Sequence, residues 1–525
     1  MISVCTLVFT VLVVFGAHAH PLWGDEAETA LYARNILKYG IPKGWDGVNI
    51  MGHTDAVTLN GDLINYSNPW PQYYLTALSF RLFGQSSFSA RIPFILLSIF
   101  TIPLYYLLLG KLTNRRIALI GTVLLSLSVQ YILFSYQSRY YALTNFSALL
   151  FWYASTNLVT SSVWPKVLFV ASGTLGLYAN YIGFPFWFLG VGLFGIIHQW
   201  KSGMVLKSWL MRYVALGSVI ALLFLPWVVI LRVSSSRWMT TFSSLGEYLY
   251  FFPFWLWRVY RQFEAANIYP IGVVLISVFF MIRKRSNILA AATMSVCIGF
   301  ILLTVASMII VSDSVLYSIR FHTSYIFLFL LIAAVCFDAI WRWKKFVGIV
   351  VLILFLLTNV FGFSRPRSVL FEYLRDISHP YKTPDEVVAT YLETHAKWGE
   401  TAFVNLDRNH DPLIFHLGDR LKFVNRVSAN NDRLFPKNYG ILPSYIYNFI
   451  GLPDWVILYG TYIQKDHKDA FDARPLPLGV DLNEEYTEHI LPIYFSDTSR
   501  PEIELRSFTA TTPKPQARIF MYKRK

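Results

Sequence analysis

The sequence predicts a polytopic α-helical membrane protein that carries an α/β domain at its C-terminal end. The first observation is composition: of 525 residues, 55% are hydrophobic and only 14% are charged, whereas ordinary soluble domains carry about 25% charged residues. The second is a series of apolar runs that reach about 18 residues, the length that a membrane-spanning helix requires. The third is a drop in hydropathy after residue 363, which persists to the C-terminus.

The apolar runs predict about eleven membrane spans. They are expected at residues 2–17, 88–110, 117–135, 140–158, 166–183, 184–199, 213–231, 269–282, 288–311, 322–341 and 346–363. The first run leads into Ala17-His18-Ala19, which has the A-x-A pattern of a signal-peptide cleavage site, but no basic residue precedes it. We therefore expect an uncut first span, and cleavage after Ala19 stays open.

Charged side chains predict the orientation of these spans. Basic residues fall in alternate short loops, which the positive-inside rule places in the cytoplasm: Lys111, Arg115, Arg116, Lys166, Lys201, Lys207, Arg212, Arg283, Lys284, Arg285, Arg342, Lys344 and Lys345. Apart from Asp338, the acidic residues before residue 364 fall on the other side: Asp25, Glu26, Glu28, Asp46, Asp55, Asp62, Glu247, Glu264 and Asp313. We therefore expect a multi-pass protein of the cytoplasmic (inner) membrane with its N-terminus inside and its C-terminal domain outside. Because the cytoplasmic loops account for much of the net charge of +14, that charge does not indicate a nucleic-acid partner.

Two outer loops are long enough to have structure of their own. In the first, residues 18–87, Asp25 followed by Glu28 resembles a capping box, and Gly40 would end the helix. A second segment of this loop, residues 69–84, gives a helix of about 14 residues, which is too short to cross the bilayer and is expected at its interface. The second outer loop, residues 232–268, is aromatic and basic, and we expect an amphipathic segment resting on the membrane.

Residues 364–525 are predicted to form an extracytoplasmic α/β domain, separate from a transmembrane catalytic domain at residues 1–363. The segments TAFVNL (401–406) and PDWVILYG (453–460) read as buried strands, and TPDEVVATYLETHA (383–396) reads as a capped helix. A domain of this size can fold alone. We identify no catalytic motif in it.

Several short patterns do not indicate a site. Gly190, Gly192 and Gly195 match GxGxxG, but they lie inside an apolar span with no preceding strand, so close helix packing explains them better. His18 and His20 beside the acids do not have the spacing of a recognised zinc site, and no metal site is predicted. The three cysteines, Cys5, Cys297 and Cys336, lie in apolar spans and predict neither a disulfide framework nor a metal cluster.

The adjacent acids Asp25 and Glu26 are the main candidates for chemistry. They could serve only the helix that they begin, since carboxylates are favourable at a helix N-terminus. Their place at the outer membrane boundary favours a functional role. Arg139 and Arg320 lie at the same boundary, where an arginine is costly unless it is paired or functional, and Arg258 and Arg261 lie in the aromatic loop. Such arginines suit a phosphate leaving group, and a carboxylate suits the base that an attacking hydroxyl or amine requires.

Five segments taken together resemble the GT-C glycosyltransferases, in particular the branch of the protein O-mannosyltransferases and the lipid A aminoarabinose transferases. They are WGDEAETALYARNILKYGIP (23–42), PWPQYYLTALSFRLFGQSSFSARIP (69–93), QSRYYAL (137–143), LYANYIGF (177–184) and RFHTSYIF (320–327). Each is weak alone, but their order and the matching topology make the set specific. The resemblance covers residues 1–345.

The resemblance implies a GT-C fold and transfer of a sugar from a polyprenyl-phosphate donor on the outer face, generally with inversion. It assigns the base to Asp25, a role in positioning the acceptor to Glu26, and the donor phosphate to Arg139 and Arg320. We expect Arg258 and Arg261 to assist with the phosphate. Three residues of the matching segments are expected to line the substrate site: Asn68, Tyr73 and Tyr181.

Two departures from the family pattern concern the substrates. Asn68 stands where the aminoarabinose transferases carry lysine, and the two following prolines are split, in SNPWPQYY. This weakens the case for aminoarabinose as the sugar. The WWDYG-type segment of oligosaccharyltransferases is absent from the sequence, which argues against transfer of whole oligosaccharides to asparagine.

The sequence therefore predicts an inverting glycosyltransferase that moves one sugar from a polyprenyl-phosphate carrier to a lipid, glycan or protein acceptor. No cofactor is assigned, and a divalent cation stays open. The alternatives are a transporter of lipid-linked sugars or lipids, a transferase with a pyrophosphate donor, and an envelope-assembly protein without catalysis. A transporter is expected to carry polar groups near the bilayer midplane, whereas the charges here lie at the boundaries of the spans.

Overall fold

The computed structural model of the chain describes most of the predicted spans and part of the C-terminal segment. The described residues are 1–19, 21–51, 59, 62–66, 68–201, 206–231, 245–265, 272, 274–275, 277–280, 287–309, 319–358, 360, 369–378, 382–404, 407–424, 426–428, 441–442, 445–447, 452–459, 482–493 and 517–525. The chain forms two compact units. The helical unit comprises Met1–Ala17, Ile92–Ile377 and Pro501–Leu505, and the mixed unit comprises His18–Arg91, Ser378–Arg500 and Arg506–Lys525.

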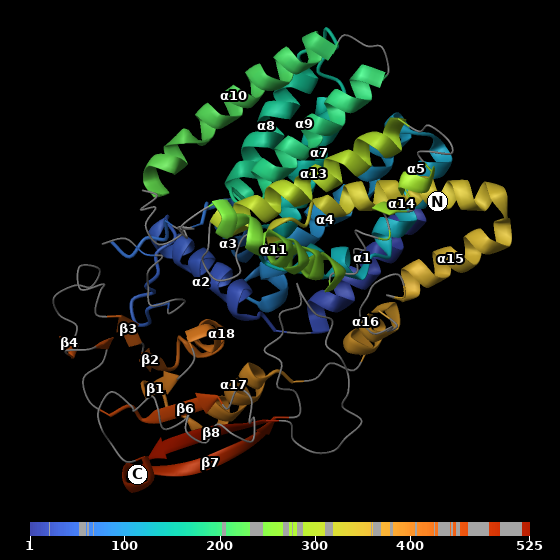
Figure 1. The fold of residues 1–525 in the computed structure, drawn as a ribbon. Helices are drawn as coiled ribbons and strands as arrows, with labels where there is room; N and C mark the ends of the chain where they lie inside the picture. Colours follow the sequence, from blue (N-terminus) through green and yellow to red (C-terminus); the bar gives the residue numbers. More distant parts are fainter. Residues whose placement is uncertain are drawn as a thin grey trace. The chain divides into compact units, whose positions relative to one another are not determined.

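The helical unit is a bundle of apolar helices (Figure 1). Its helices are α1 (Ile2–Ala19) and α4 (Ser87–Leu112), each of which has one end in the mixed unit, then α5 (Arg115–Ser126), α6 (Val129–Tyr136), α7 (Tyr140–Ser155), α8 (Trp164–Ala179), α9 (Phe184–Lys201), α10 (Leu206–Leu231), α11 (Leu245–Ala265), α13 (Asn287–Ile309), the 3-10 turn η2 (Ile319–Phe321), α14 (Tyr325–Trp343), α15 (Lys345–Leu357) and α16 (Val369–Ser378). Helix α14 lies inside the bundle, because most of its residues are buried and it packs against α5, α13 and α15.

Five of the described helices are long and apolar enough to cross a membrane: α1, α4, α14, and residues 206–229 and 287–308 of α10 and α13. Helices α5 and α6 pass the same test together, but they meet at an angle of 62°. Helix α9 and helix α15 are shorter apolar helices. Most of the expected span 269–282 lies outside the described residues. The chain is thus a helical membrane protein with several spans, and the count of about eleven stays a prediction.

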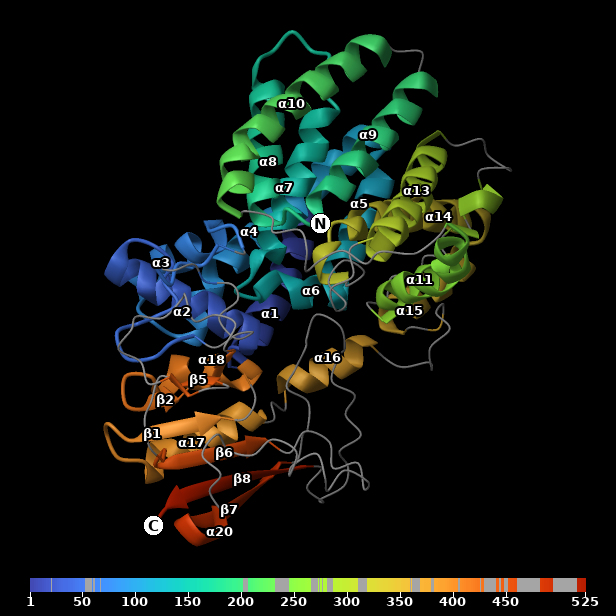
Figure 2. The same ribbon diagram turned by 60° about the vertical axis from the view of Figure 1, so that its left-hand side comes forward.

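The mixed unit combines the first outer loop with the C-terminal segment (Figure 2). The loop supplies α2 (Gly24–Tyr39) and α3 (Pro71–Phe83). The C-terminal segment supplies α17 (Pro384–His395), β1 (Thr401–Val404), α18 (Asp407–Leu417), β2 (Lys422–Val424), β3 (Arg426–Ser428), β4 (Ile441–Leu442), β5 (Tyr445–Tyr447), β6 (Trp455–Tyr459), α20 (Leu482–Glu485), β7 (Tyr486–Ile493) and β8 (Ala517–Arg524). The expected division at residue 363 into two domains is not tested by this grouping and stays a prediction.

The main sheet has the strand order β2-β1-β6-β8-β7. Strand β1 runs parallel to β2 and β6, whereas β8 runs antiparallel to β6 and β7. A second, three-stranded antiparallel sheet has the order β3-β5-β4. Helix α18 contacts β1, and helix α17 contacts β7. The strands expected in TAFVNL and PDWVILYG are present as β1 and β6.

Local sequence signals explain where several helices begin and end. The helix expected at residues 383–396 is capped as predicted, and Thr383 and Glu386 form a capping box at the start of α17. Helix α2 ends at Gly40 with φ 77°, and α3 ends at Gly84 with φ 79°, conformations that glycine adopts without strain. The expected N-cap at Asp25 is wrong: α2 begins at Gly24, its N-cap is Trp23, and Asp25 lies within the first turn.

One hydrophobic core runs through the mixed unit. It joins α2 and α3 of the loop to α17, α18 and the main sheet, and all its members are buried. Phe80 of α3 and Phe415 of α18, for example, stack with their ring centroids 6.3 Å apart. Burial of apolar surface is worth about 25 cal/mol per Å², so this shared core holds the acid-bearing loop against the C-terminal segment.

Candidate functional site

The two candidate acids occupy the first turn of α2 but have different surroundings. The side chain of Asp25 is 7% exposed, while Glu26 is completely buried. The positive end of the helix favours negative charge at both positions. Since successive residues of a helix point about 100° apart, the two carboxylates face different neighbours.

Glu26 forms a buried, two-pronged ion pair with Arg91 at the start of α4. Arg91 Nε donates to Oε1 at 2.8 Å, and Arg91 Nη2 donates to Oε2 at 2.5 Å. The same Nη2 also donates to the Pro21 carbonyl oxygen at 2.9 Å. Arg91 is 1% exposed. The geometry therefore fixes the first turn of α2 to the residues that precede it and to α4.

Arg139 and Arg320 belong to the helical unit, where a pair of aromatic rings connects them. Arg139 is the N-cap residue of α7 and is 7% exposed; its guanidinium lies 5.9 Å from the ring of Tyr140. Arg320 lies in η2, and its guanidinium lies 5.0 Å from the ring of Phe321. The rings of Tyr140 and Phe321 stack with centroids 6.0 Å apart. Two arginines from distant parts of the sequence are thus brought to one region of the bundle.

The aromatic outer loop forms helix α11, which contacts η2. Arg258 is exposed and packs over Phe254 and Trp255 of its own helix. Arg261 is half exposed; it packs over a ring of the same helix and pairs with Glu264 at 3.2 Å. Both arginines therefore lie on the exposed side of α11, and their role toward a donor phosphate stays a prediction.

The three expected lining residues fall in both units. Tyr73 is fully buried in α3, with its ring 4.9 Å from that of Tyr32. Asn68 is half-buried just before α3, and its backbone amide donates to Asn65 Oδ1 at 3.2 Å. Tyr181 is half-buried in the turn between α8 and α9 of the helical unit. Asn68 and Tyr73 thus belong to the same unit as the two acids, whereas Tyr181 belongs to the same unit as Arg139 and Arg320.

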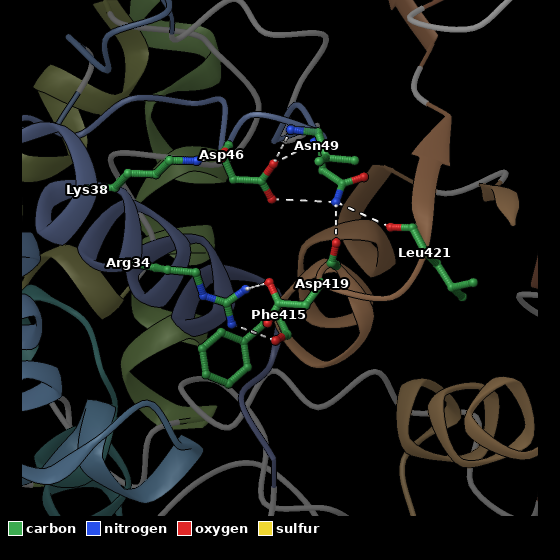
Figure 3. A network of polar contacts seen from close by, with 9 residues as sticks. Arg34, Lys38, Asp46, Asn49, Phe415, Asp419 and Leu421 are labelled. Atoms are coloured by element: carbon green, nitrogen blue, oxygen red, sulfur yellow. Dashed lines mark hydrogen bonds and ion pairs between the residues drawn. The ribbon is translucent and has the colours of Figure 1, made fainter. Parts of the chain in front are cut away.

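A polar network ties the loop after α2 to the C-terminal segment (Figure 3). The fully buried Asn49 accepts from the Phe423 amide at 2.7 Å and donates to the Gly418 carbonyl at 3.0 Å and, at 3.4 Å, to the Leu421 carbonyl. Arg34 of α2 donates to the Phe415 carbonyl at 2.8 Å. Burial lowers the pKa of the Arg34 guanidinium from its ordinary value. These contacts join residues that lie 369 to 381 positions apart in the sequence.

Residues 67–230 match the family model of the dolichyl-phosphate-mannose-protein mannosyltransferases. The structure is similar to that of ArnT from Cupriavidus metallidurans bound to undecaprenyl phosphate, with a TM-score of 0.54 and 13% identity over 99% of this chain and 97% of that one. ArnT in the apo state gives a TM-score of 0.55 at the same identity and coverage. The chain has the GT-C fold.

Two further comparisons are weaker. An oligosaccharyltransferase from Archaeoglobus fulgidus gives a TM-score of 0.48 with 12% identity, covering 80% of this chain and 61% of that one. No curated protein matches the chain by sequence. The predicted resemblance to the GT-C superfamily is nevertheless confirmed by the family model and by the two ArnT structures.

Two buried side chains near α2 were not among the residues expected from the sequence. Arg91 lies at the start of an apolar span, where an arginine is costly unless it is paired or functional, and the same signal that marks Arg139 marks it. Asp411 of α18 lies close to Tyr32: burial raises the pKa of Tyr32 well above its ordinary value, and the charges of Glu28 and Asp411 contribute to the rise. Asp411 is fully buried. No sequence signal connects it to α2, because the contact depends on the packing of α18.

The histidines near the acids give no metal centre within the described ranges. No group of three or more His, Cys, Asp or Glu side chains among those residues could hold a metal ion. The ring of His18 stacks on Phe88 at 3.9 Å between centroids. His20 lies outside the described residues.

Proposed function

We propose that this protein is an inverting membrane glycosyltransferase. It takes a single sugar from a polyprenyl-phosphate carrier and transfers it to a lipid, glycan or protein acceptor on the outer face of the cytoplasmic membrane. The observation that carries this proposal is the similarity of nearly the whole chain to ArnT bound to undecaprenyl phosphate. The match of residues 67–230 to a mannosyltransferase family that uses a lipid-phosphate sugar supports the same class of donor.

The reaction requires one base and a stabilised leaving group. An acceptor hydroxyl or amine attacks the anomeric carbon from the face opposite the phosphate, and the bond between that carbon and the phosphate oxygen breaks. Asp25 takes the proton of the acceptor as general base. Arg139 and Arg320 neutralise the charge that develops on the departing polyprenyl phosphate. A single displacement of this kind inverts the configuration at the anomeric carbon.

Glu26 has a supporting part in this scheme. Because Arg91 engages both of its carboxylate oxygens, Glu26 fixes the first turn of α2 and so positions its neighbour Asp25. Asn68 and Tyr73 lie on the acceptor side with these acids, whereas Tyr181 lies with the donor arginines. Arg258 and Arg261 guide the charged end of the carrier lipid along α11.

The substitution Asp25→Asn tests the assignment. It keeps the size of the side chain and removes the base, so we expect transfer from a panel of radiolabelled polyprenyl-phosphate sugars to fall by at least about 100-fold, the usual contribution of a general base. The thermal unfolding midpoint should stay that of the wild type. Glu393→Gln, which changes an exposed carboxylate of α17 in the same way, is the control and should transfer normally.

Near-normal transfer by Asp25→Asn would remove the catalytic role of Asp25. Movement of intact carrier-linked sugar without cleavage would indicate a transporter.

A further inference from the structure

The turn that carries Arg320 is held by a buried asparagine of α7. Asn145 Oδ1 accepts hydrogen bonds from Thr323 Oγ1 at 2.7 Å and from Ser324 Oγ at 3.2 Å. All three side chains are 3% exposed or less. Asn145 lies in the helix that begins after Arg139, and its two donors follow η2 directly. One amide oxygen therefore connects the segments that carry the two arginines.

A second asparagine fixes the backbone of the same turn. Asn180, the C-cap residue of α8, donates from Nδ2 to the Phe321 carbonyl at 2.8 Å, and its Oδ1 accepts from the Gly183 amide at 2.8 Å. A Cβ atom at Gly183 would overlap the Phe321 carbonyl oxygen, so the α8–α9 turn approaches as closely as a backbone can. The turn is thus held on one side by α7 and on the other by Asn180.

These bonds lie in a buried region, where low local polarity strengthens hydrogen bonds and makes their loss costly. The stacked rings of Tyr140 and Phe321 lie between the same two segments. Electrostatic stabilisation of a leaving group depends on donors that are held in place before the charge develops. The structure therefore provides a fixed spacing for the two arginine-bearing segments.

We propose, on the basis of the proposed function, that Asn145 is a positioning residue that sets the spacing of Arg139 and Arg320 for the phosphate of the polyprenyl carrier. It acts through Thr323 and Ser324 and does not itself contact the phosphate. Asn180 restrains the same turn through its backbone. The two arginines thereby bind the phosphate as a preformed pair. The affinity for the phosphate then depends on the side-chain amide of Asn145, although that amide does not contact the phosphate.

A matched pair of variants at Thr323 tests this role with little change of shape. Thr323→Val removes the hydroxyl that Asn145 accepts from, and Thr323→Ser keeps it. We expect Thr323→Val and Asn145→Leu each to weaken binding of undecaprenyl phosphate by roughly fivefold, the equivalent of about one hydrogen bond. Thr323→Ser should bind as the wild type does. The control is Thr122→Val, which removes a buried hydroxyl that donates to the Ala118 carbonyl of its own helix at 2.8 Å.

Coupling to Arg320 separates positioning from a general loss of structure. In an Arg320→Ala background, Thr323→Val should cause little further loss of undecaprenyl phosphate binding, because the group that it positions is gone. The role of Asn145 would be overturned if Thr323→Val and Arg320→Ala each weakened binding by the same factor in the double variant as alone, or if Thr323→Val left binding unchanged in the wild-type background. Either result would leave the proposed function intact. Undecaprenyl phosphate binding that is insensitive to Arg320→Ala would overturn the phosphate role of Arg320 and, with it, this inference. Absence of transfer in the wild-type protein with every donor would count against the proposed function itself.

Discussion

Asp25 and Glu26 are adjacent in the sequence, but their side chains have different surroundings. Glu26 is fully buried and bound through both oxygens by Arg91, so its carboxylate is committed to an internal contact. Asp25, one position earlier, is the acid to which we assign the proposed chemistry. A buried ion pair of this kind adds little net stability when intact, but loss of one partner leaves an uncompensated charge. The pair is therefore best understood as a device that orients the first turn of α2.

This gives a prediction for Arg91. Arg91→Met should destabilise the protein by about 3–5 kcal/mol because it leaves the Glu26 carboxylate buried and unpaired. The double variant Glu26→Gln with Arg91→Met should recover much of this loss, since no charge is then stranded. Thermal unfolding in detergent measures both. If the double variant is as unstable as the single one, packing of Arg91, and not its charge, is what matters.

At the level of elements, the helix that carries the acids is packed from two directions. Helix α3 lies against it within the loop, and α18 of the C-terminal segment lies against it as well. Asn49 and Arg34 add hydrogen bonds to backbone atoms around α18 and β2. Backbone groups in that turn would otherwise be buried without partners, which is costly. The C-terminal segment therefore takes part in holding α2.

Asn49 gives the second prediction. Asn49→Ala removes a buried side chain that serves three backbone groups, so we expect a loss of about 2–4 kcal/mol in the free energy of unfolding. Hydrogen exchange should also rise at the amide of Phe423. Lys38→Met is the matched control, because the exposed Lys38 bonds to the Asp46 carbonyl in the same network and should change stability by less than about 0.5 kcal/mol. Equal effects of the two variants would show that burial of Asn49 is unimportant.

The main sheet gives a prediction about pH. Burial raises the pKa of the Glu400 carboxyl, but hydrogen bonds from Lys523 at 2.6 Å and from Trp455 at 2.7 Å outweigh it, so that the pKa is lowered from its ordinary value of 4.5. A lowered carboxyl pKa stabilises the folded state above the unfolded value, and this contribution is lost as the pH falls through the folded value. Between pH 7 and pH 3.5, the thermal midpoint of Glu400→Gln should therefore fall less than that of the wild type. Parallel curves for the two proteins would contradict this.

At the level of the whole molecule, the charge pattern fixes an expected orientation, with residues 364–525 outside. Trp398 of the mixed unit and Trp164 at the start of α8 are both strongly exposed, at 74% and 75%. They lie on opposite sides of the membrane if the positive-inside rule holds for this chain. Single cysteines at these two positions therefore report the orientation.

The corresponding prediction uses intact cells and a membrane-impermeant maleimide. In a background without Cys5, Cys297 and Cys336, Trp398→Cys should be labelled in intact cells, while Trp164→Cys should be labelled only after the inner membrane is made permeable. Labelling of both positions from outside, or the reverse order, would overturn the proposed topology. The folded state of each variant is checked by its transfer activity.

The class of this protein and much of its local structure follow from the amino-acid sequence alone. Apolar runs and charge placement predict a helical membrane protein, because only helices with internally satisfied backbones can use such runs to cross a bilayer. Capping and glycine signals place the start of α17 and the ends of α2 and α3, because these depend on neighbours within a few residues. The motif segments carry the resemblance to the GT-C superfamily.

Which side chains meet depends on the tertiary packing. Arg91 reaches Glu26 across 65 residues, Thr323 reaches Asn145 across 178, and Asn49 meets Phe423 across 374. Periodicity and local signals do not report such distances, because these contacts depend on how α4, α7 and α18 pack. The sequence presents Asp25 and Glu26 as adjacent acids, and only the packing reveals that Arg91 binds both carboxylate oxygens of Glu26.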